Sequence, residues 1–100
     1  MWKKVGGHHA VSTEGQEIRF FGRDELIYTE HRHGSDDRAV TVYAGLLLGR
    51  ASRSIEAGPR VLKRWNAPHE TEEISEEHRK HIASSIAEAL DCLKISYEFT

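Results

Sequence analysis

One helical pattern near the C-terminal end constrains the fold more than any other feature of this chain. Its apolar residues recur at helical spacing and form a single stripe: Ile82, Ile86, Ala89, Leu90 and Leu93. Ser75 is a good N-cap before this stripe, and Glu76 and Glu77 suit the positive end of a helix dipole. We therefore predict one helix that packs its stripe against a sheet, while Arg79 and Glu88 face solvent.

The rest of the chain carries the two-residue alternation that is typical of half-buried strands. The clearest alternating segments are 17–21, 26–30, 38–44, 54–57, 60–65 and the terminal 95–99. Strands, then one helix, then a closing strand predict an α+β fold. We expect an antiparallel sheet of about five to six strands, with one long C-terminal helix packed on one face and a closing terminal strand.

The composition is that of one globular domain spanning residues 1–100, with 38% hydrophobic and 30% charged residues. The net charge is −2, from 14 basic and 16 acidic side chains, which argues against a dedicated nucleic-acid binder. Cys92 is the only cysteine, so no internal disulfide can form and a reducing cytosol fits best.

The N-terminal residues and the longest apolar run do not have the length of an export signal or a membrane span. Residues 1–7 include two lysines but no apolar core long enough for a signal peptide. The longest apolar run, 44–49, is far too short to span a membrane. We therefore expect a cytoplasmic protein with no membrane partner. His8 and His9, next to two glycines, indicate a mobile N-terminus.

The seven histidines raise the question of a metal site. His31 and His33 in one segment, and His78 and His81 one helical turn apart, have ligand-like spacings. Neither pair has a third ligand nearby in sequence. We expect these histidines to be solvated, with no metal and no cofactor.

The sequence offers no reaction motif, so we assign no catalytic residue and expect the protein not to be an enzyme. A reactive cysteine needs a basic neighbour, whereas Cys92 follows Asp91. No Gly-x-Ser-x-Gly, phosphate loop or dinucleotide fingerprint occurs. A catalytic carboxylate pair stays an open alternative, because such pairs carry no local signature.

Five basic residues between positions 50 and 64 are the candidates for binding nucleic acid. They are Arg50, Arg53, Arg60, Lys63 and Arg64, with Tyr43 and Trp65 as possible stacking platforms for single strands. Glu56 interrupts the cluster, and basic residues on an exposed strand mainly protect a sheet edge from aggregation. We expect no nucleic-acid partner.

The segment that leads into the helix carries an aromatic corner followed by an acidic run. Trp65 and Pro68 form a Trp-x-x-Pro pattern, which pins a corner because the indole covers apolar surface and the proline stops strand pairing. The acidic run is Glu70, Glu72, Glu73, Glu76 and Glu77. These carboxylates either form a solvated helix cap or form a surface complementary to a basic partner. Asp36 and Asp37 belong to that surface if the 31–37 loop lies on the same side of the molecule.

A wider pattern resembles a family of small bacterial immunity proteins from polymorphic toxin systems. The matching positions are Tyr43-Ala44-Gly45-Leu46-Leu47-Leu48-Gly49, Trp65, Pro68, His69 and the helix leading to Ile95-Ser96-Tyr97-Glu98. The likeness covers roughly residues 17–99, and Ala67 stands where the family pattern has a second proline.

The resemblance implies an α+β protein that binds and neutralises a cognate toxin, and the acidic run predicts that this toxin has a basic surface. In that case the acidic run, Asp36 and Asp37 bind the partner, while Trp65 and Pro68 hold the scaffold. The alternative is a small enzyme or ligand-binding α+β domain, which a deep pocket holding histidine or carboxylate pairs would favour. The toxin's identity and the oligomeric state do not follow from the sequence.

Overall fold

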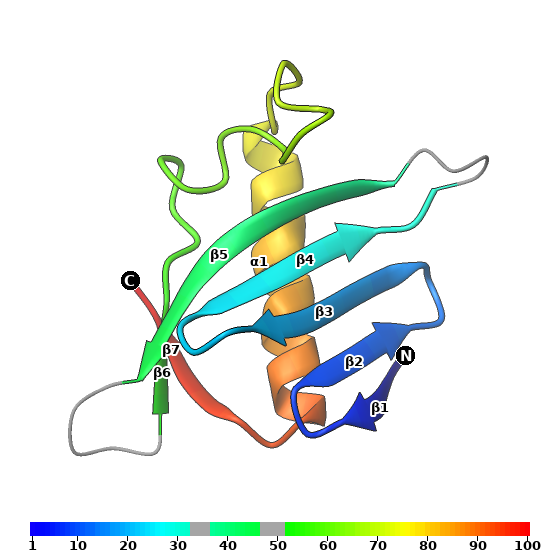
Figure 1. Ribbon diagram of the computed structural model, residues 1–100, viewed down its shortest axis with the longest axis vertical. Coiled ribbons are helices and arrows are strands. Elements are labelled where there is room, and N and C mark those ends of the chain that lie inside the picture. The colour runs from blue at the N-terminus through cyan, green and yellow to red at the C-terminus, as the bar shows by residue number, and fades with distance from the viewer. Residues whose placement is uncertain (33–36, 47–51) are drawn as a thin grey trace.

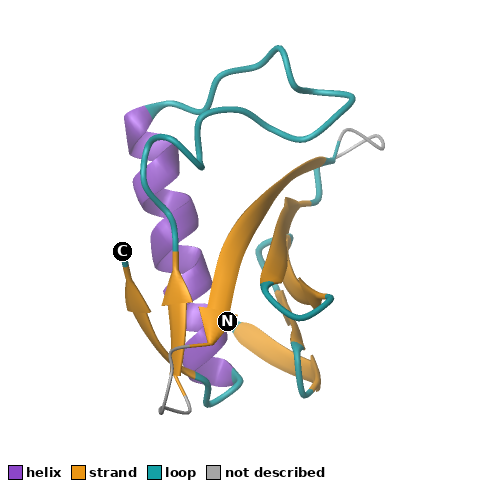
Figure 2. Ribbon diagram, turned by 60° about the vertical axis from the view of Figure 1, so that its left-hand side comes forward, coloured by secondary structure: helices purple, strands orange, loops and turns teal. Residues whose placement is uncertain are grey.

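The computed structural model describes residues 1–32, 37–46 and 52–100, which form one sheet and one helix (Figure 1). The elements are β1 (Trp2–Gly6), β2 (His9–Ser12), β3 (Gln16–Phe21), β4 (Glu25–Glu30), β5 (Arg38–Leu46), β6 (Ser52–Ile55), α1 (Glu76–Cys92) and β7 (Ser96–Phe99). The strands lie in sequential order from β1 to β7 in a single seven-stranded sheet. This sheet curls into a half-barrel that wraps one side of α1 (Figures 1 and 2).

The predicted α+β class with one long helix is confirmed, but the sheet differs from the prediction in two respects. It has seven strands rather than five to six, and β7 pairs with β6 in parallel, whereas all other neighbours are antiparallel. Parallel neighbours need a crossover connection, usually a helix. The segment between β6 and β7 contains α1, which makes this crossover.

The first additional strands are the hairpin β1–β2, where the sequence indicated a mobile terminus. Ala10 of β2 is fully buried and pairs with Ile18 of β3. Trp2 of β1 packs against the core, and its Nε1 donates to Glu88 Oε1 of α1 over 3.2 Å. Contacts with distant residues therefore order this hairpin, and they leave no signal in the local sequence.

The predicted strand at 60–65 is wrong, because this segment forms turns. The backbone N–H groups of Val61 and Leu62 both donate to the carbonyl of Gly58, at 3.1 and 2.9 Å. Leu62 and Trp65 are nevertheless buried, at 1% and 4% exposure. The two residues are three positions apart, and the turn directs both side chains into the core. The apparent alternation of this segment concealed the turn.

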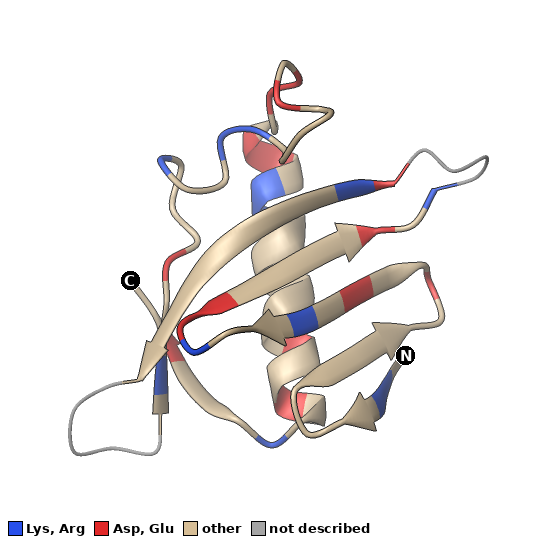
Figure 3. Ribbon diagram, viewed as in Figure 1, with Lys and Arg blue, Asp and Glu red and all other residues tan. Residues whose placement is uncertain are grey.

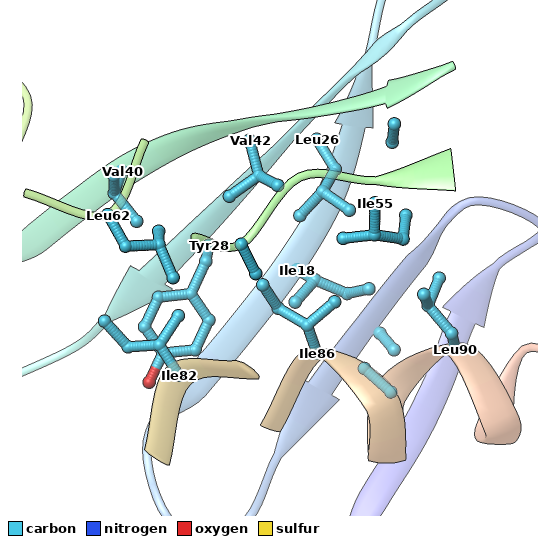
Figure 4. Packing of buried hydrophobic residues seen from close by; sticks show 14 of the residues in the cluster. Ile18, Leu26, Tyr28, Val40, Val42, Ile55, Leu62, Ile82, Ile86 and Leu90 are labelled. Carbon is cyan, nitrogen blue, oxygen red and sulfur yellow. The ribbon is translucent and has the colours of Figure 1, made fainter. Parts of the chain in front are cut away.

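The core lies between the concave face of the sheet and the helix stripe (Figure 4). Ile82, Ile86, Ala89 and Leu90 are fully buried and Leu93 nearly so. They pack with buried strand residues: Ile18, Leu26, Tyr28, Val40, Val42 and Ile55. The predicted buried face of the helix is confirmed, and Glu88 is exposed as predicted. Arg79, which was predicted to face solvent, is instead half-buried, because positions 79, 82 and 86 lie near the same face of the helix.

Both ends of α1 are closed by hydrogen bonds. Ser75 is the N-cap, as predicted, and its Oγ accepts from the backbone N–H of His78 over 3.1 Å. At the C-terminal end, Lys94 has a φ of +58°. The N–H of Lys94 donates to Asp91 O, and the N–H of Ile95 donates to Leu90 O, at 3.1 and 2.9 Å. This is a Schellman motif, and it turns the chain into β7.

Among the described residues, no helix is both long enough and apolar enough to cross a membrane.

Candidate functional site

An open cleft of ≈ 740 Å³ lies where the β2–β3 turn, the end of β4 and the start of α1 meet. Its polar lining comprises Glu14 from the β2–β3 turn, Gln16 from the start of β3, Glu30, His31 and Arg32 from β4 and the residues after it, the N-cap Ser75, and Glu77, His78 and His81 from α1. These residues are spread over positions 14–81, so only the fold brings them together. Among the predicted partner-binding residues that the structure describes, only Glu77 lines this cleft.

One wall of the cleft is formed by the hydrogen-bonded side chains of Glu30 and His78. Glu30 Oε2 accepts from His78 Nε2 at 2.6 Å and from the Tyr28 hydroxyl at 2.8 Å, while Oε1 accepts from Arg32 at 3.0 Å. Burial raises the pKa of Glu30, but these hydrogen bonds outweigh it, so the pKa lies below its ordinary value. Burial, and then the hydrogen bond to Glu30, raise the pKa of Tyr28.

Trp65 packs behind this wall. The edge of its ring meets the ring of His78, with centroids 5.4 Å apart, and the Arg32 guanidinium lies 5.7 Å from the centre of the indole. The predicted scaffold residue is thus buried beneath two residues of the cleft. Pro68, the other predicted scaffold residue, is exposed and follows a cis peptide bond. The structural roles of both residues stay predictions.

A second group of histidines and carboxylates lies beside the cleft. Glu17 of β3 accepts hydrogen bonds from His9 and from His31, whose Nε2 is 2.6 Å from Glu17 Oε1. His31 Nδ1 is 2.9 Å from Asp37 Oδ2. The hydrogen bonds to Glu17 and then Asp37 raise the pKa of His31. Burial raises the pKa of Glu17, but its hydrogen bonds from His31 and His9 bring the net value below the ordinary one.

The cleft lining includes Gln16, a buried residue with 8% exposure. Its Nε2 is 2.7 Å from His81 Nε2 and 3.2 Å from Ser85 Oγ. Because an amide nitrogen donates, His81 Nε2 is the acceptor in this contact.

All five carboxylates of the acidic run are exposed, on the loop before α1 and in its first turn. Figure 3 shows these acidic segments at one end of the molecule. Three of them pair with basic side chains: Glu72 with Arg38 at 2.8 Å, Glu73 with Arg64 at 3.6 Å, and Glu76 with Arg79 and Lys80 at 3.9 Å each. Glu70 and Glu77 have no ion-pair partner within the described parts of the chain.

The hairpin carboxylate Asp37 lies at the same end as the acidic run. Its Oδ1 accepts from the backbone N–H of Arg32 over 3.1 Å. The next residue, Arg38, reaches Glu72, and this contact links the start of β5 to the acidic loop. Asp36 lies outside the described residues.

The histidine pairs that suggested a metal site have other partners. The rings of His78 and His81 are 6.1 Å apart, but His78 binds Glu30 and His81 binds Gln16. Across residues 1–32, 37–46 and 52–100, no three His, Cys, Asp or Glu side chains are grouped so as to hold a metal ion. His33 lies outside the described residues.

The candidate basic patch is interrupted at Arg53. This side chain lies over the ring of Phe20 at 4.9 Å and donates to the carbonyls of Arg23 and Ala44, both at 2.9 Å. Arg53 is therefore used within the fold, and Arg50 lies outside the described residues.

Comparison of the chain with known protein families, with functionally characterised proteins and with solved structures gives no match. The functional argument therefore depends on the residues and geometry of the chain itself.

Proposed function

We propose that this protein is an immunity-type inhibitor, which binds a cognate bacterial toxin through protein–protein contact and neutralises it. The observation that carries the proposal is the exposure of all five carboxylates of the acidic run at one end of the molecule. An acidic surface suits a partner with a basic surface, because complementary charge speeds the encounter and selects the partner. The resemblance of the Trp65–Pro68 corner to immunity proteins supports the same function.

The acidic loop is held in place, which favours recognition by a preformed surface. Glu72 binds Arg38, whose side chain is only 9% exposed, and Trp65 anchors the start of the loop in the core. The backbone N–H of Ile74 donates to Lys63 O over 2.8 Å and closes the loop at its base. A surface that is ordered before binding loses less conformational entropy on association.

A second candidate function is a ligand-binding or catalytic role for the cleft, which the Glu30–His78 pair on its wall favours. However, Glu30 accepts three hydrogen bonds on its two oxygens, and its pKa lies below the ordinary value. A general base works best with a pKa near the working pH and with an oxygen available to take the proton. Partner binding therefore agrees better with the geometry than acid–base catalysis does.

The test is co-expression of the chain with the protein encoded by the adjacent gene. The proposal expects a stable complex on co-purification and rescue of growth in cells that express the toxin. In the control chain, residues 70–77 are scrambled. This keeps their composition and charge but changes the positions of the carboxylates. A neighbouring protein that is toxic, but neither binds the chain nor is neutralised by it, would overturn the proposal.

A further inference from the structure

The seven-stranded sheet is not closed into a barrel, so β1 and β7 form its two outer edges. An edge strand presents N–H and C=O groups that can pair with a strand of another chain. The first part of β5 is a third possible edge, because the described pairing with β6 covers only residues 44–46. There the backbone N–H of Asn66 donates to Ala39 O over 2.7 Å and covers the strand.

The β1 edge is protected against pairing with another chain. Lys3 and Lys4 are exposed in the middle of this strand, and the pairing register with β2 shifts between Lys4 and Gly6. Lysine side chains and bulges are common means by which proteins blunt an edge strand. In contrast, β7 pairs with β6 without a shift and contains no lysine and no proline. The edge that remains open is therefore β7, the strand that ends at the C-terminus in Figure 2.

Two aromatic residues supply the outward backbone groups of β7. The backbone N–H of Thr100 donates to Ile55 O of β6 over 2.9 Å. Backbone groups alternate in direction along a strand, so those of Glu98 also face β6, whereas those of Tyr97 and Phe99 face away from it. No strand among the described residues lies on that outer side. Tyr97 and Phe99 therefore each offer one donor and one acceptor to a strand from outside.

The side chains of β7 determine which strand fits this edge. Tyr97 and Phe99 share one face, with ring centroids 5.6 Å apart, and Phe99 is 42% exposed. Glu98 is exposed on the opposite face. Aromatic residues pair well with β-branched residues across strands, and opposite charges attract each other. A matching strand therefore has apolar residues beside the two rings and a basic residue opposite Glu98.

A second copy of this chain fits the edge poorly. The antiparallel register that uses all the outward groups pairs Tyr97 of each copy with Phe99 of the other. In that register Glu98 lies directly opposite Glu98 of the other copy, at a position without hydrogen bonds, where facing side chains are closest. Like charges in this position destabilise a sheet. The charge of Glu98 thus selects a different chain over a second copy.

We propose that β7 receives an extended segment of a partner protein, which adds a strand to the sheet and carries a basic residue between two apolar residues. Main-chain hydrogen bonds give affinity in this type of recognition, and alternate side chains give specificity. The edge and the chemistry of the segment follow from β7 itself. The identity of the partner as the toxin rests on the function proposed above.

Titration with a peptide, followed by NMR, tests the edge without the toxin. The probe is a synthetic β-hairpin whose outer strand reads Thr-Val-Lys-Val-Thr, with the N–H groups of both valines facing outward. The amide protons of Tyr97 and Phe99 should exchange quickly with solvent in the free chain and become protected when the peptide binds. The amide proton of Glu98 should be protected in both states, because it faces β6.

Three results of this titration would overturn the inference. The first is that the peptide does not bind, and the second is that protection appears at β1 instead of β7. The third is protection of Tyr97 and Phe99 that grows with the concentration of the free chain, because it would identify a second copy as the occupant.

Two control peptides separate the backbone contribution from the charge contribution. N-methylation of both valines removes the outward donors and should abolish binding. Glutamate in place of the lysine should weaken binding about threefold to tenfold, because it replaces attraction to Glu98 by repulsion. Equal binding of either control peptide and the probe would overturn the inference.

A matched pair of variants localises the binding on the chain. Phe99→Pro and Phe99→Ala both remove the ring, but only proline removes the outward N–H, and proline is tolerated on the outer side of an edge strand. Phe99→Pro should bind the peptide about fivefold to tenfold more weakly than Phe99→Ala. Equal affinities would contradict pairing at β7. Protection of the Glu98 amide checks that β7 still pairs with β6.

A charge reversal tests the same edge without a proline. Glu98→Lys should reverse the preference, so that the glutamate peptide binds more tightly than the lysine peptide. Glu25→Lys makes the same change at the exposed start of β4 and should keep the preference of the parent. A reversal in both variants, or in neither, would overturn the inference.

The variants at position 99 also separate this inference from the proposed function. If the toxin binds Phe99→Pro and Phe99→Ala with equal affinity, the toxin is not the occupant of β7, while the inhibitor function stands. If the peptide binds as expected but the protein encoded by the adjacent gene does not bind the chain, the inhibitor function fails. In that case β7 keeps its specificity for a basic strand.

Discussion

His78 Nε2 and Glu30 Oε2 lie 2.6 Å apart, and this contact joins the first turn of α1 to the end of β4. The two residues are 48 positions apart in the chain. Their contact closes one wall of the cleft and covers the Tyr28 hydroxyl, which donates to the same carboxylate oxygen. The pair therefore connects the packing of the helix on the sheet with the shape of the candidate site.

Removing the carboxylate of this pair should destabilise the fold. In Glu30→Ala, the buried Tyr28 hydroxyl loses its acceptor and His78 its partner, so the free energy of unfolding should fall by about 1–3 kcal/mol. Glu25→Ala, at the exposed start of the same strand, is the control and should change stability by less than about 0.5 kcal/mol. Urea denaturation measures both. Equal stability of the two variants would show that the pair contributes nothing.

Trp65→Ala should remove a large part of the stability of this small domain. The side chain is 4% exposed and packs in the core behind the cleft, and deleting a buried large aromatic costs about 3–5 kcal/mol. The control is Phe21→Ala, an aromatic that is 59% exposed. Thermal melts are the measurement. A melting temperature of Trp65→Ala close to that of the parent would contradict a scaffold role for this residue.

Lys94→Gly should stabilise the protein by about 0.5–1 kcal/mol, because Lys94 adopts the left-handed conformation, which favours glycine. Lys94→Ala removes the same charge but keeps the Cβ atom, so it should give no such gain. Chemical denaturation of both variants separates the backbone effect from the charge effect. A glycine variant no more stable than the alanine variant would refute the argument.

Stability should be greatest in a weakly acidic window. The pKa of His31 is raised above its ordinary 6.5 in the fold, so its contribution is present below 6.5 and is lost as the pH rises through the folded value. The pKa values of Glu17 and Glu30 are lowered from 4.5, so their contributions are present above 4.5 and are lost as the pH falls through the folded values. The window therefore lies between about 4.5 and 6.5.

Unfolding measured across this pH range checks the prediction. The parent should be less stable at about pH 8.5 than at about pH 5.5, and His31→Gln should lose much of this difference. An unchanged alkaline decline in His31→Gln would assign it to another group. His31 is about half exposed, so the effect should also weaken with added salt.

The local pattern of apolar and polar residues predicted those elements in which burial repeats with the period of a strand or a helix. The stripe from Ile82 to Leu93 gave the helix and its buried face, and alternation gave β3, β4 and most of β5. The pattern failed where burial depends on distant partners, as for Ala10 in β2, or where a turn buries two residues, as at Leu62 and Trp65. The Glu30–His78 contact was not predictable, because it depends on how the helix lies on the sheet.

If the protein is the inhibitor that we propose, the acidic run should act mainly on the rate of association with its toxin. The triple variant Glu70→Gln/Glu73→Gln/Glu76→Gln removes three exposed charges and leaves Glu72 in place, because that carboxylate binds Arg38. Long-range attraction sums over charges, so association at low salt should slow about tenfold, while dissociation changes little. High salt should remove most of the difference, because screening shortens the reach of the field.

The control for this experiment changes the same number of charges elsewhere on the surface, at Glu25, Glu56 and Glu88. These three residues are exposed and lie outside the acidic run. If steering depends on where the charges lie, the control should associate with the toxin faster than the triple variant at low salt. Two outcomes would show that the acidic run only caps the helix and that the toxin contacts another surface: association of the triple variant as fast as the parent, or equal slowing in the control.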